Sequence, residues 1–147
     1  MPRVIDGDNL LGTWPGRSRG DADKRALARD VDALRRDDKR RIVVVFDGSP
    51  PPGVSYGPDV LFSGKGRTAD AVILELLRQQ NDKRGWTVVT NDRSLADQSR
   101  WLGARVEGAR DFRLRLSRDT ADEKPETADD LTYWLEQFAR DDPKASR

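Results

Sequence analysis

Short runs of apolar residues, each bounded by polar turns, are the most regular pattern in the chain. Residues 41–46 form an almost unbroken apolar run, which is typical of a strand buried on both faces of a parallel sheet. Residues 86–90 repeat the pattern, and shorter candidates lie at 3–5, 59–62 and 104–106. These runs predict the strands of one central sheet.

Between these runs, hydrophobic residues recur at the three- and four-residue spacing of a helix face. The spacing predicts helices over 21–36, after an N-cap at Thr68, and over 94–102 with Gly103 as the stop signal. Strands that alternate with helices indicate βαβ units. The predicted fold class is therefore α/β with a mostly parallel sheet.

The remaining segments are less regular. Residues 7–20 are rich in Gly, Asn and Pro and are expected to be a loop, while 109–118 fits a strand or a helix equally well. We expect the main domain to span 1–118. Residues 119–147 would then be a polar linker, a helix over 127–140 that packs on the domain, and a disordered tail.

The composition limits the possible chemistry. The chain has 147 residues, enough for one domain, and it contains neither cysteine nor histidine. This excludes disulfides, thiolate and imidazole catalysis and nearly every zinc site, so carboxylates are the main catalytic candidates. No apolar stretch approaches the roughly 20 residues of a membrane span, and a cytoplasmic location is the default expectation.

Acidic residues follow the ends of the predicted strands. Asp6, Asp47 and Asp92 each end or follow one of these runs, and Asp70 lies in the first turn of the helix after Thr68. In an open parallel sheet, binding sites form beyond the carboxyl ends of the strands. The four aspartates are therefore expected to converge on one crevice.

Carboxylates gathered in this way repel one another unless cations bind among them. Mg²⁺ or Mn²⁺ is the expected cofactor, because hard cations prefer oxygen ligands. One or two such ions could support phosphodiester hydrolysis. Each acid also has a structural alternative, since aspartate is common as a turn residue, a helix cap or a partner of the helix dipole.

Neighbouring polar residues are candidates for supporting roles at this site. Asn9 could bind substrate, fix its loop or orient Asp6, and Asp8 could point away or assist metal binding indirectly. Asp97 lies about one helical turn after Asp92, where it could bind the metal or simply face solvent.

Substrate contacts are expected from basic and helix-start residues. Lys65 and Arg67 lie on a glycine loop beside Asp70 and could bind phosphate. Arg93 and Ser94 lie at a helix start, where backbone amides favour anions. Trp14 could stack on a base or belong to the core.

The same residues form an ordered set of motifs that resembles the YacP-like family of the NYN branch of PIN-like nucleases. The resemblance covers residue 3 to about 118. Its pieces are Val4-Ile5-Asp6-Gly7-Asp8-Asn9, Val44-Val45-Phe46-Asp47-Gly48, Phe62-Ser63-Gly64-Lys65-Gly66-Arg67-Thr68-Ala69-Asp70 and Val88-Val89-Thr90-Asn91-Asp92-Arg93-Ser94-Leu95-Ala96-Asp97.

This resemblance implies a three-layer α/β/α fold and Mg²⁺- or Mn²⁺-dependent, endonucleolytic cleavage of RNA. It implies metal roles for Asp6, Asp70 and Asp92 and an active-site role for Asp47. Single-stranded RNA or ribosome-associated mRNA would be the partner, in RNA processing or decay. The chain departs from many family members at Asp8, where they carry an aromatic residue, and the C-terminal helix lies outside the shared part.

Two other functions fit parts of the pattern. A haloacid-dehalogenase-like phosphatase would use Asp6 as nucleophile and Asp8 as general acid, with Asp92 and Asp97 on Mg²⁺ and Lys65 on phosphate. That scheme leaves the other acids without a role, and the chain has no room for a cap domain. A non-catalytic RNA- or ribosome-binding module is the second alternative, although all four acids are intact.

Overall fold

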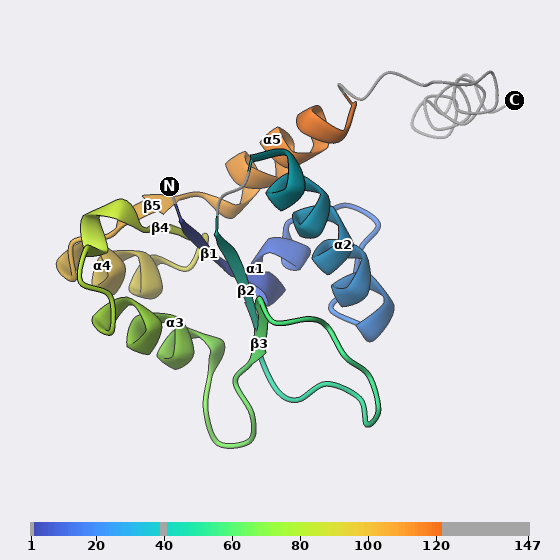
Figure 1. Ribbon diagram of the computed structural model, residues 1–147, viewed down its shortest axis with the longest axis horizontal. Helices are drawn as coiled ribbons and strands as arrows, with labels where there is room; N and C mark the ends of the chain where they lie inside the picture. The colour runs from blue at the N-terminus through green and yellow to red at the C-terminus, as the bar shows by residue number, and fades with distance from the viewer. Residues whose placement is uncertain (1, 39–40, 122–147) are drawn as a thin grey trace, which may run out of the picture. The chain divides into compact units, whose positions relative to one another are not determined.

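The computed structural model describes residues 2–38 and 41–121, and the predicted strand and helix pattern is largely confirmed (Figure 1). In chain order the elements are β1 (Arg3–Asp6), α1 (Gly7–Gly12), α2 (Asp21–Asp38), β2 (Ile42–Phe46), β3 (Val60–Phe62), α3 (Ala69–Arg78), η1 (Lys83–Gly85, a 3-10 turn), β4 (Thr87–Val89), α4 (Arg93–Trp101), β5 (Arg105–Glu107) and α5 (Ala109–Ala121).

The five strands of the described residues pair in parallel, in the order β3-β2-β1-β4-β5, which confirms the predicted parallel sheet. The chain starts in the middle of the sheet, moves outward through β2 and β3, and returns to the other side of β1 to form β4 and β5. The order therefore reverses between β1 and β4. Binding sites of open α/β sheets form beyond the strand ends at such a reversal.

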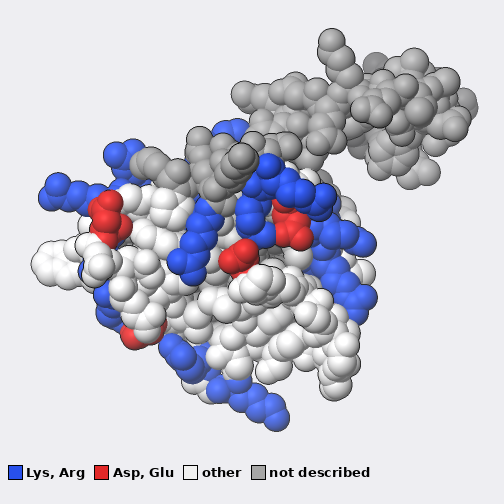
Figure 2. All heavy atoms as spheres, in the orientation of Figure 1, with Lys and Arg blue, Asp and Glu red and all other residues white. Residues whose placement is uncertain are grey.

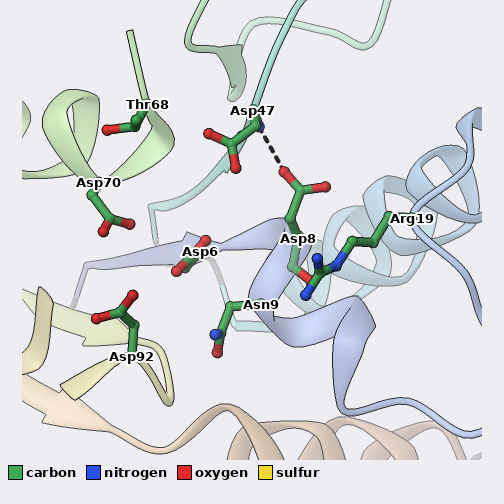
Figure 3. Close-up of a pocket in the computed structure, with 8 residues that line it drawn as sticks. All are labelled: Asp6, Asp8, Asn9, Arg19, Asp47, Thr68, Asp70 and Asp92. Atoms are coloured by element: carbon green, nitrogen blue, oxygen red, sulfur yellow. Dashed lines mark hydrogen bonds between the residues drawn. The ribbon is translucent and has the colours of Figure 1, made fainter. Parts of the chain in front are cut away.

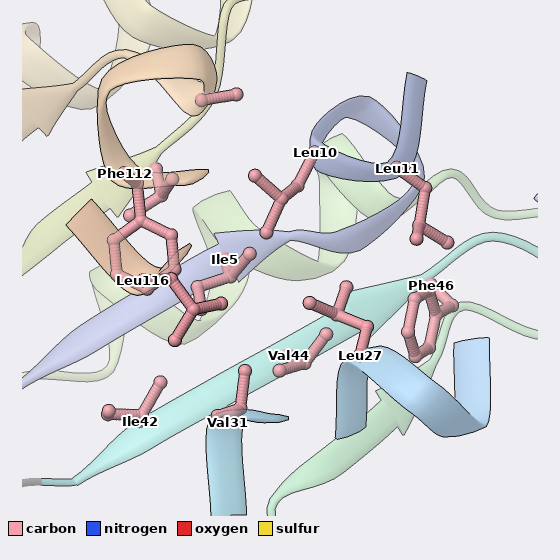
Figure 4. Packing of buried hydrophobic residues seen from close by; sticks show 12 residues of the cluster. Ile5, Leu10, Leu11, Leu27, Val31, Ile42, Val44, Phe46, Phe112 and Leu116 are labelled. Carbon is pink, nitrogen blue, oxygen red and sulfur yellow. The ribbon is translucent and has the colours of Figure 1, made fainter. Parts of the chain in front are cut away.

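Alternate side chains of each strand enter opposite layers of core, because successive residues of a strand point to opposite faces. Val4 pairs with Val43 and belongs to one buried cluster, whereas Ile5 pairs with Val44 and belongs to the other. The cluster that contains Ile5 lies against α1, α2 and α5 (Figure 4). The other cluster is covered by α3 and α4, so the fold is the expected α/β/α sandwich.

The prediction that residues 7–20 form a loop is wrong for its first part, which is helix α1. Leu10 and Leu11 are fully buried and hold this short helix against the sheet. A Cβ at Gly7 would collide with the Phe46 ring, so the start of α1 lies directly on β2. Glycine and asparagine have low helix propensity, so the sequence pattern of this segment did not indicate a helix.

The ambiguous segment 109–118 belongs to helix α5, in which Ala109, Phe112 and Leu116 are buried at helical spacing. The chain divides into two compact units, 1–117 and 118–147, and the second is described only to residue 121. The predicted helix over 127–140 and the tail lie outside the described residues. No helix in the described ranges is long and apolar enough to span a bilayer.

Candidate active site

A pocket of about 240 Å³ opens at the carboxyl edge of the sheet, beside the point where the strand order reverses (Figure 3). It brings together the four aspartates that the sequence predicted to converge. We call it the acid pocket, and it is lined by Asp6, Asp8, Asn9, Arg19, Asp47, Thr68, Asp70 and Asp92.

Asp6 ends β1 and forms the buried floor of this pocket, with only 5% of its surface exposed. The Thr90 hydroxyl donates a hydrogen bond to its Oδ2 atom at 3.0 Å. Burial raises the pKa of Asp6 to about 7 against the lowering effect of that bond, and the charges of Asp70 and Asp47 raise it further. Asp6 is therefore a carboxyl group that a cation would convert to the ionised form.

Asp92 lies in the short connection after β4 and is the N-cap of α4. Its Oδ1 atom accepts a hydrogen bond from the Leu95 amide at 3.1 Å, and its own amide donates to the Thr90 hydroxyl at 3.0 Å. The structural and functional alternatives for Asp92 are thus compatible, because a capping carboxylate also lines the pocket. Thr90 connects Asp6 to Asp92 through one hydroxyl.

Asp47 follows β2 and ties this strand to the start of α3. Its Oδ1 atom accepts a hydrogen bond from the Ala69 amide at 2.7 Å. Its own amide donates to Oδ2 of Asp8 at 2.6 Å. This carboxylate fixes the position of α3, and with it the position of Asp70 in the first turn of that helix.

Asp70 differs from the other acids, since no hydrogen bond within the described ranges holds its carboxylate. Burial is the main cause of its raised pKa, and the charges of Asp92 and Asp47 add to the effect. Of the four acids, Asp70 is therefore the one for which a role in stabilising the fold explains its position least.

Asp8 lies in the pocket wall rather than pointing away from it, and it is 8% exposed. Its Oδ2 atom accepts from the Asp47 amide, and its Oδ1 atom lies 3.7 Å from the Lys24 ammonium. The side-chain atoms of Asp8 and of Lys24 are each 12% exposed. This carboxylate is engaged in joining α1, α2 and the end of β2. No sequence pattern marked Lys24 as a site residue, because its partner Asp8 is distant along the chain.

Asn9 fixes the loops around the pocket, which is one of the roles proposed for it. Its Oδ1 atom accepts a hydrogen bond from the Asn91 amide at 2.7 Å. Asn91 in turn accepts from the Ala109 amide at 2.8 Å. The Asn9 backbone also hydrogen-bonds to the Asp6 carboxylate and opposes the rise of the Asp6 pKa.

Arg19 is a pocket residue that the sequence analysis missed. Among the described residues it is the one cation that lines the acid pocket, and its Nε atom donates to the Asp8 carbonyl at 3.1 Å. A Cβ at Gly12 would lie 2.9 Å from its Nη2 atom, so the guanidinium lies against the end of α1. Arg19 lies in an irregular segment without periodicity, and no sequence pattern marked it.

The structure does not bring Asp97 or Ser94 into the acid pocket. Asp97 is exposed on α4, and its Oδ1 atom lies 3.5 Å from the Arg100 guanidinium. The Ser94 hydroxyl accepts a hydrogen bond from Gln98 at 3.2 Å. For Asp97, the solvent-facing alternative fits the geometry.

The other predicted substrate contacts, apart from Asn9, also lie outside the pocket lining. Lys65 and Arg93 are exposed, and Arg67 lines a different groove. Trp14 is half-buried against the core, and its ring is covered by the Arg17 guanidinium at 4.0 Å. Base stacking by Trp14 therefore finds no support in this arrangement.

Comparison with known proteins agrees with this architecture. The model of the YacP-like NYN domain family matches residues 3–141. The chain belongs to this family. The match extends well beyond residue 118, so the expectation that the C-terminal part lies outside the shared region is wrong. As a YacP-like NYN domain, the protein has a nuclease domain of the PIN-like type.

Solved structures share the fold of this YacP-like NYN domain. A crystal structure of Rae1 (YacP) from Bacillus subtilis is 19% identical with a TM-score of 0.68, covering 98% of this chain and 84% of that one. A point mutant of the same protein is 22% identical with a TM-score of 0.67, covering 85% and 86%. None of the curated proteins matches the chain.

The donor atoms of the acid pocket fit a divalent cation. They are carboxylate oxygens, which Mg²⁺ and Mn²⁺ prefer, and they come from Asp6, Asp47, Asp70 and Asp92. As these side chains stand, no group of three acidic residues in the described ranges is arranged to ligate one ion. One or two of these carboxylates could hold an ion whose other ligands are waters. Rotation of Asp70, whose carboxylate no hydrogen bond in the described ranges holds, could add a further ligand.

Proposed function

We propose that this protein is a ribonuclease that hydrolyses RNA phosphodiester bonds with Mg²⁺ or Mn²⁺ in the acid pocket. The observation that carries the proposal is the convergence of Asp6, Asp47, Asp70 and Asp92, together with Arg19, at the reversal of the sheet. Membership of the NYN family supports the nuclease class.

In this proposal, Asp6, Asp70 and Asp92 hold the cation, and Asp47 holds α3 in place while adding negative charge. A bound divalent cation would neutralise these carboxylates and stabilise the charge that develops on the phosphodiester. The Thr90 hydroxyl orients the Asp6 carboxylate by donating to it, and it fixes the backbone at Asp92 by accepting from the Asp92 amide.

Arg19 supplies the positive charge that a phosphate needs near so many carboxylates. Its Nε atom donates to the Asp8 carbonyl, and no hydrogen bond within the described residues occupies its terminal nitrogens, which can therefore donate to a phosphate oxygen of the RNA. This role replaces the phosphate contacts that the sequence predicted at the pocket for Lys65 and Arg67.

The phosphatase alternative fits this geometry poorly. Its general acid would be Asp8, whose carboxylate accepts a bond from the Asp47 amide and lies beside Lys24. Its phosphate-binding Lys65 and metal-binding Asp97 do not line the pocket. Rapid hydrolysis of a small phosphomonoester that is abolished by Asp8→Asn would nevertheless establish it.

We further propose that cleavage is endonucleolytic and that the substrate is single-stranded RNA, including mRNA on ribosomes. The test is incubation of a circular and a linear single-stranded RNA with Mn²⁺ or Mg²⁺, with and without EDTA. We expect both RNAs to be cut and EDTA to stop the reaction. Cutting of the linear RNA alone would show exonuclease activity, and binding without cutting would favour the non-catalytic module.

A further inference from the structure

A second concave surface, of about 320 Å³, runs along the outer flank of α3 beside the edge strand β3. It shares no lining residue with the acid pocket, and the proposed chemistry leaves it without a role. We call it the α3 groove, and it is lined by Arg41, Leu61, Arg67, Val72, Glu75, Leu76, Gln79 and Gln80.

The floor of the α3 groove is apolar. Val72 and Leu76 lie one helical turn apart on α3 and are half-buried, as is Leu61 of the edge strand. They rest on the core formed by the fully buried face of α3, without being covered themselves. Half-exposed aliphatic side chains of this kind offer a surface for the flat, weakly polar face of a nucleobase.

The charged residues of the groove leave a net positive rim. Arg41 and Arg67 are both exposed. Glu75, the one acid in the lining, lies 3.9 Å from the Arg78 guanidinium and accepts a hydrogen bond from Gln79 at 3.3 Å. The Arg41 guanidinium lies over the Trp86 ring, 5.6 Å from its centroid, which leaves its charge uncompensated by an acid of the described residues. The net charge of the rim is therefore positive, which suits a phosphate backbone.

The groove and the acid pocket lie on either side of the start of α3. Arg67 lines the groove, and the next residue, Thr68, lines the acid pocket. From there the groove follows α3, whose ten residues extend about 15 Å, to Arg41 at the base of β2. Figure 2 shows Lys and Arg side chains along the lower edge of this face, where the segment between β3 and α3 lies in Figure 1.

We propose that the α3 groove binds the part of a single-stranded RNA that continues from the scissile phosphodiester. Arg67 and Arg41 contact phosphates at the two ends of the groove, and Leu61, Val72 and Leu76 contact bases between them. This proposal rests on the proposed ribonuclease function. It assigns to Arg67 a phosphate contact outside the acid pocket.

The test is the affinity of RNA for a cleavage-deficient Asp70→Asn protein, measured by fluorescence anisotropy in Mg²⁺ with single-stranded oligonucleotides of increasing length. The groove variant adds Arg41→Gln and Arg67→Gln. The control adds Arg84→Gln and Arg100→Gln, which remove two exposed charges that line neither pocket. All four substitutions are on the surface, and thermal melts verify the fold.

We expect the groove variant to lose about 10-fold in affinity for a long oligonucleotide and almost none for a very short one, while the control stays within 2-fold. The salt dependence should also fall by about 1.4 in the slope of log affinity, at about 0.7 for each phosphate contact. In otherwise unmodified protein, the same pair should raise KM for long RNA and leave kcat unchanged.

The possible failures are distinguishable. If the unmodified protein cuts RNA and the groove variant binds as tightly as the control, the groove is not the RNA path, and a protein partner becomes the better occupant. If the unmodified protein neither cuts nor binds RNA, the ribonuclease proposal itself fails, and this inference fails with it.

Discussion

Several side chains at the acid pocket stabilise the fold as well as forming the site. Asp92 caps α4, Asp47 accepts the first amide of α3, and Thr90 bonds to both Asp6 and the Asp92 amide. For these residues, loss of activity on substitution is ambiguous unless stability is measured as well. Conservative variants separate the two roles.

Replacing Thr90 by valine should lower kcat for RNA cleavage by about 10- to 100-fold, because Asp6 loses the donor that orients it. The buried acceptor on Asp6 and the Asp92 amide both lose a partner, which should cost about 1–3 kcal/mol in unfolding free energy. Thr90→Ser keeps the hydroxyl and should restore most of kcat. Equal activity of the valine and serine variants would show that Thr90 does not position the acids.

Asp92→Asn and Asp92→Ala should differ in stability but not in activity. Asparagine caps helices about as well as aspartate, so the first variant should melt close to the unmodified protein, whereas alanine should lose about 1 kcal/mol. Both should lose cleavage, since neither supplies the carboxylate. Thermal melts and RNA cleavage assays check this, and an active Asp92→Asn variant would remove Asp92 from the proposed metal site.

At the scale of elements, the sequence predicted each strand that lies in the described residues, because a parallel sheet buried on both faces leaves continuous apolar runs. It also predicted the convergence of the acids, since strand ends share one edge. It did not predict α1, because Gly7 and Asn9 have low helix propensity and the helix is stabilised by tertiary contacts. It missed Arg19 and Thr90 because their partners, Asp8 and Asp6, are brought near them by folding.

Two glycines at the ends of α1 allow the same substitution to be compared in different surroundings. Gly7→Ala should destabilise the protein by about 1–3 kcal/mol, since the new methyl group collides with the Phe46 ring. Gly12→Ala meets only the flexible end of Arg19, so stability should hold while KM for RNA rises as the guanidinium is displaced. Urea unfolding and cleavage kinetics test the pair, and equal stability losses would contradict the packing described for Gly7.

For the whole molecule, the buried acids make the stability of the metal-free protein depend on pH. Asp6 has a folded pKa of about 7 against its ordinary value of 3.8, so between these pH values the folded state holds a proton that the unfolded state releases. This contribution to stability is complete below about pH 3.8 and is lost as pH rises toward 7. Asp70 acts in the same direction.

In EDTA, the unfolding free energy of the unmodified protein should therefore decrease from pH 4.5 to pH 7.5 relative to that of Asp6→Asn, by at most about 4 kcal/mol for a shift of this size. Asparagine resembles the protonated acid and does not titrate. Urea unfolding of the two proteins at both pH values measures the difference. A difference that does not change with pH would contradict the raised pKa of Asp6.

The central claim is that the acid pocket cleaves RNA with a divalent cation, and Asp70 tests it most directly because its carboxylate has no hydrogen bond in the described structure. The measurement is Mn²⁺-dependent cleavage of an end-labelled single-stranded RNA by the unmodified protein and by Asp70→Asn, with thermal melts of both. We predict cleavage that EDTA abolishes, loss of at least about 100-fold in the variant, and an unchanged or higher melting temperature. An equally active Asp70→Asn protein would contradict the claim.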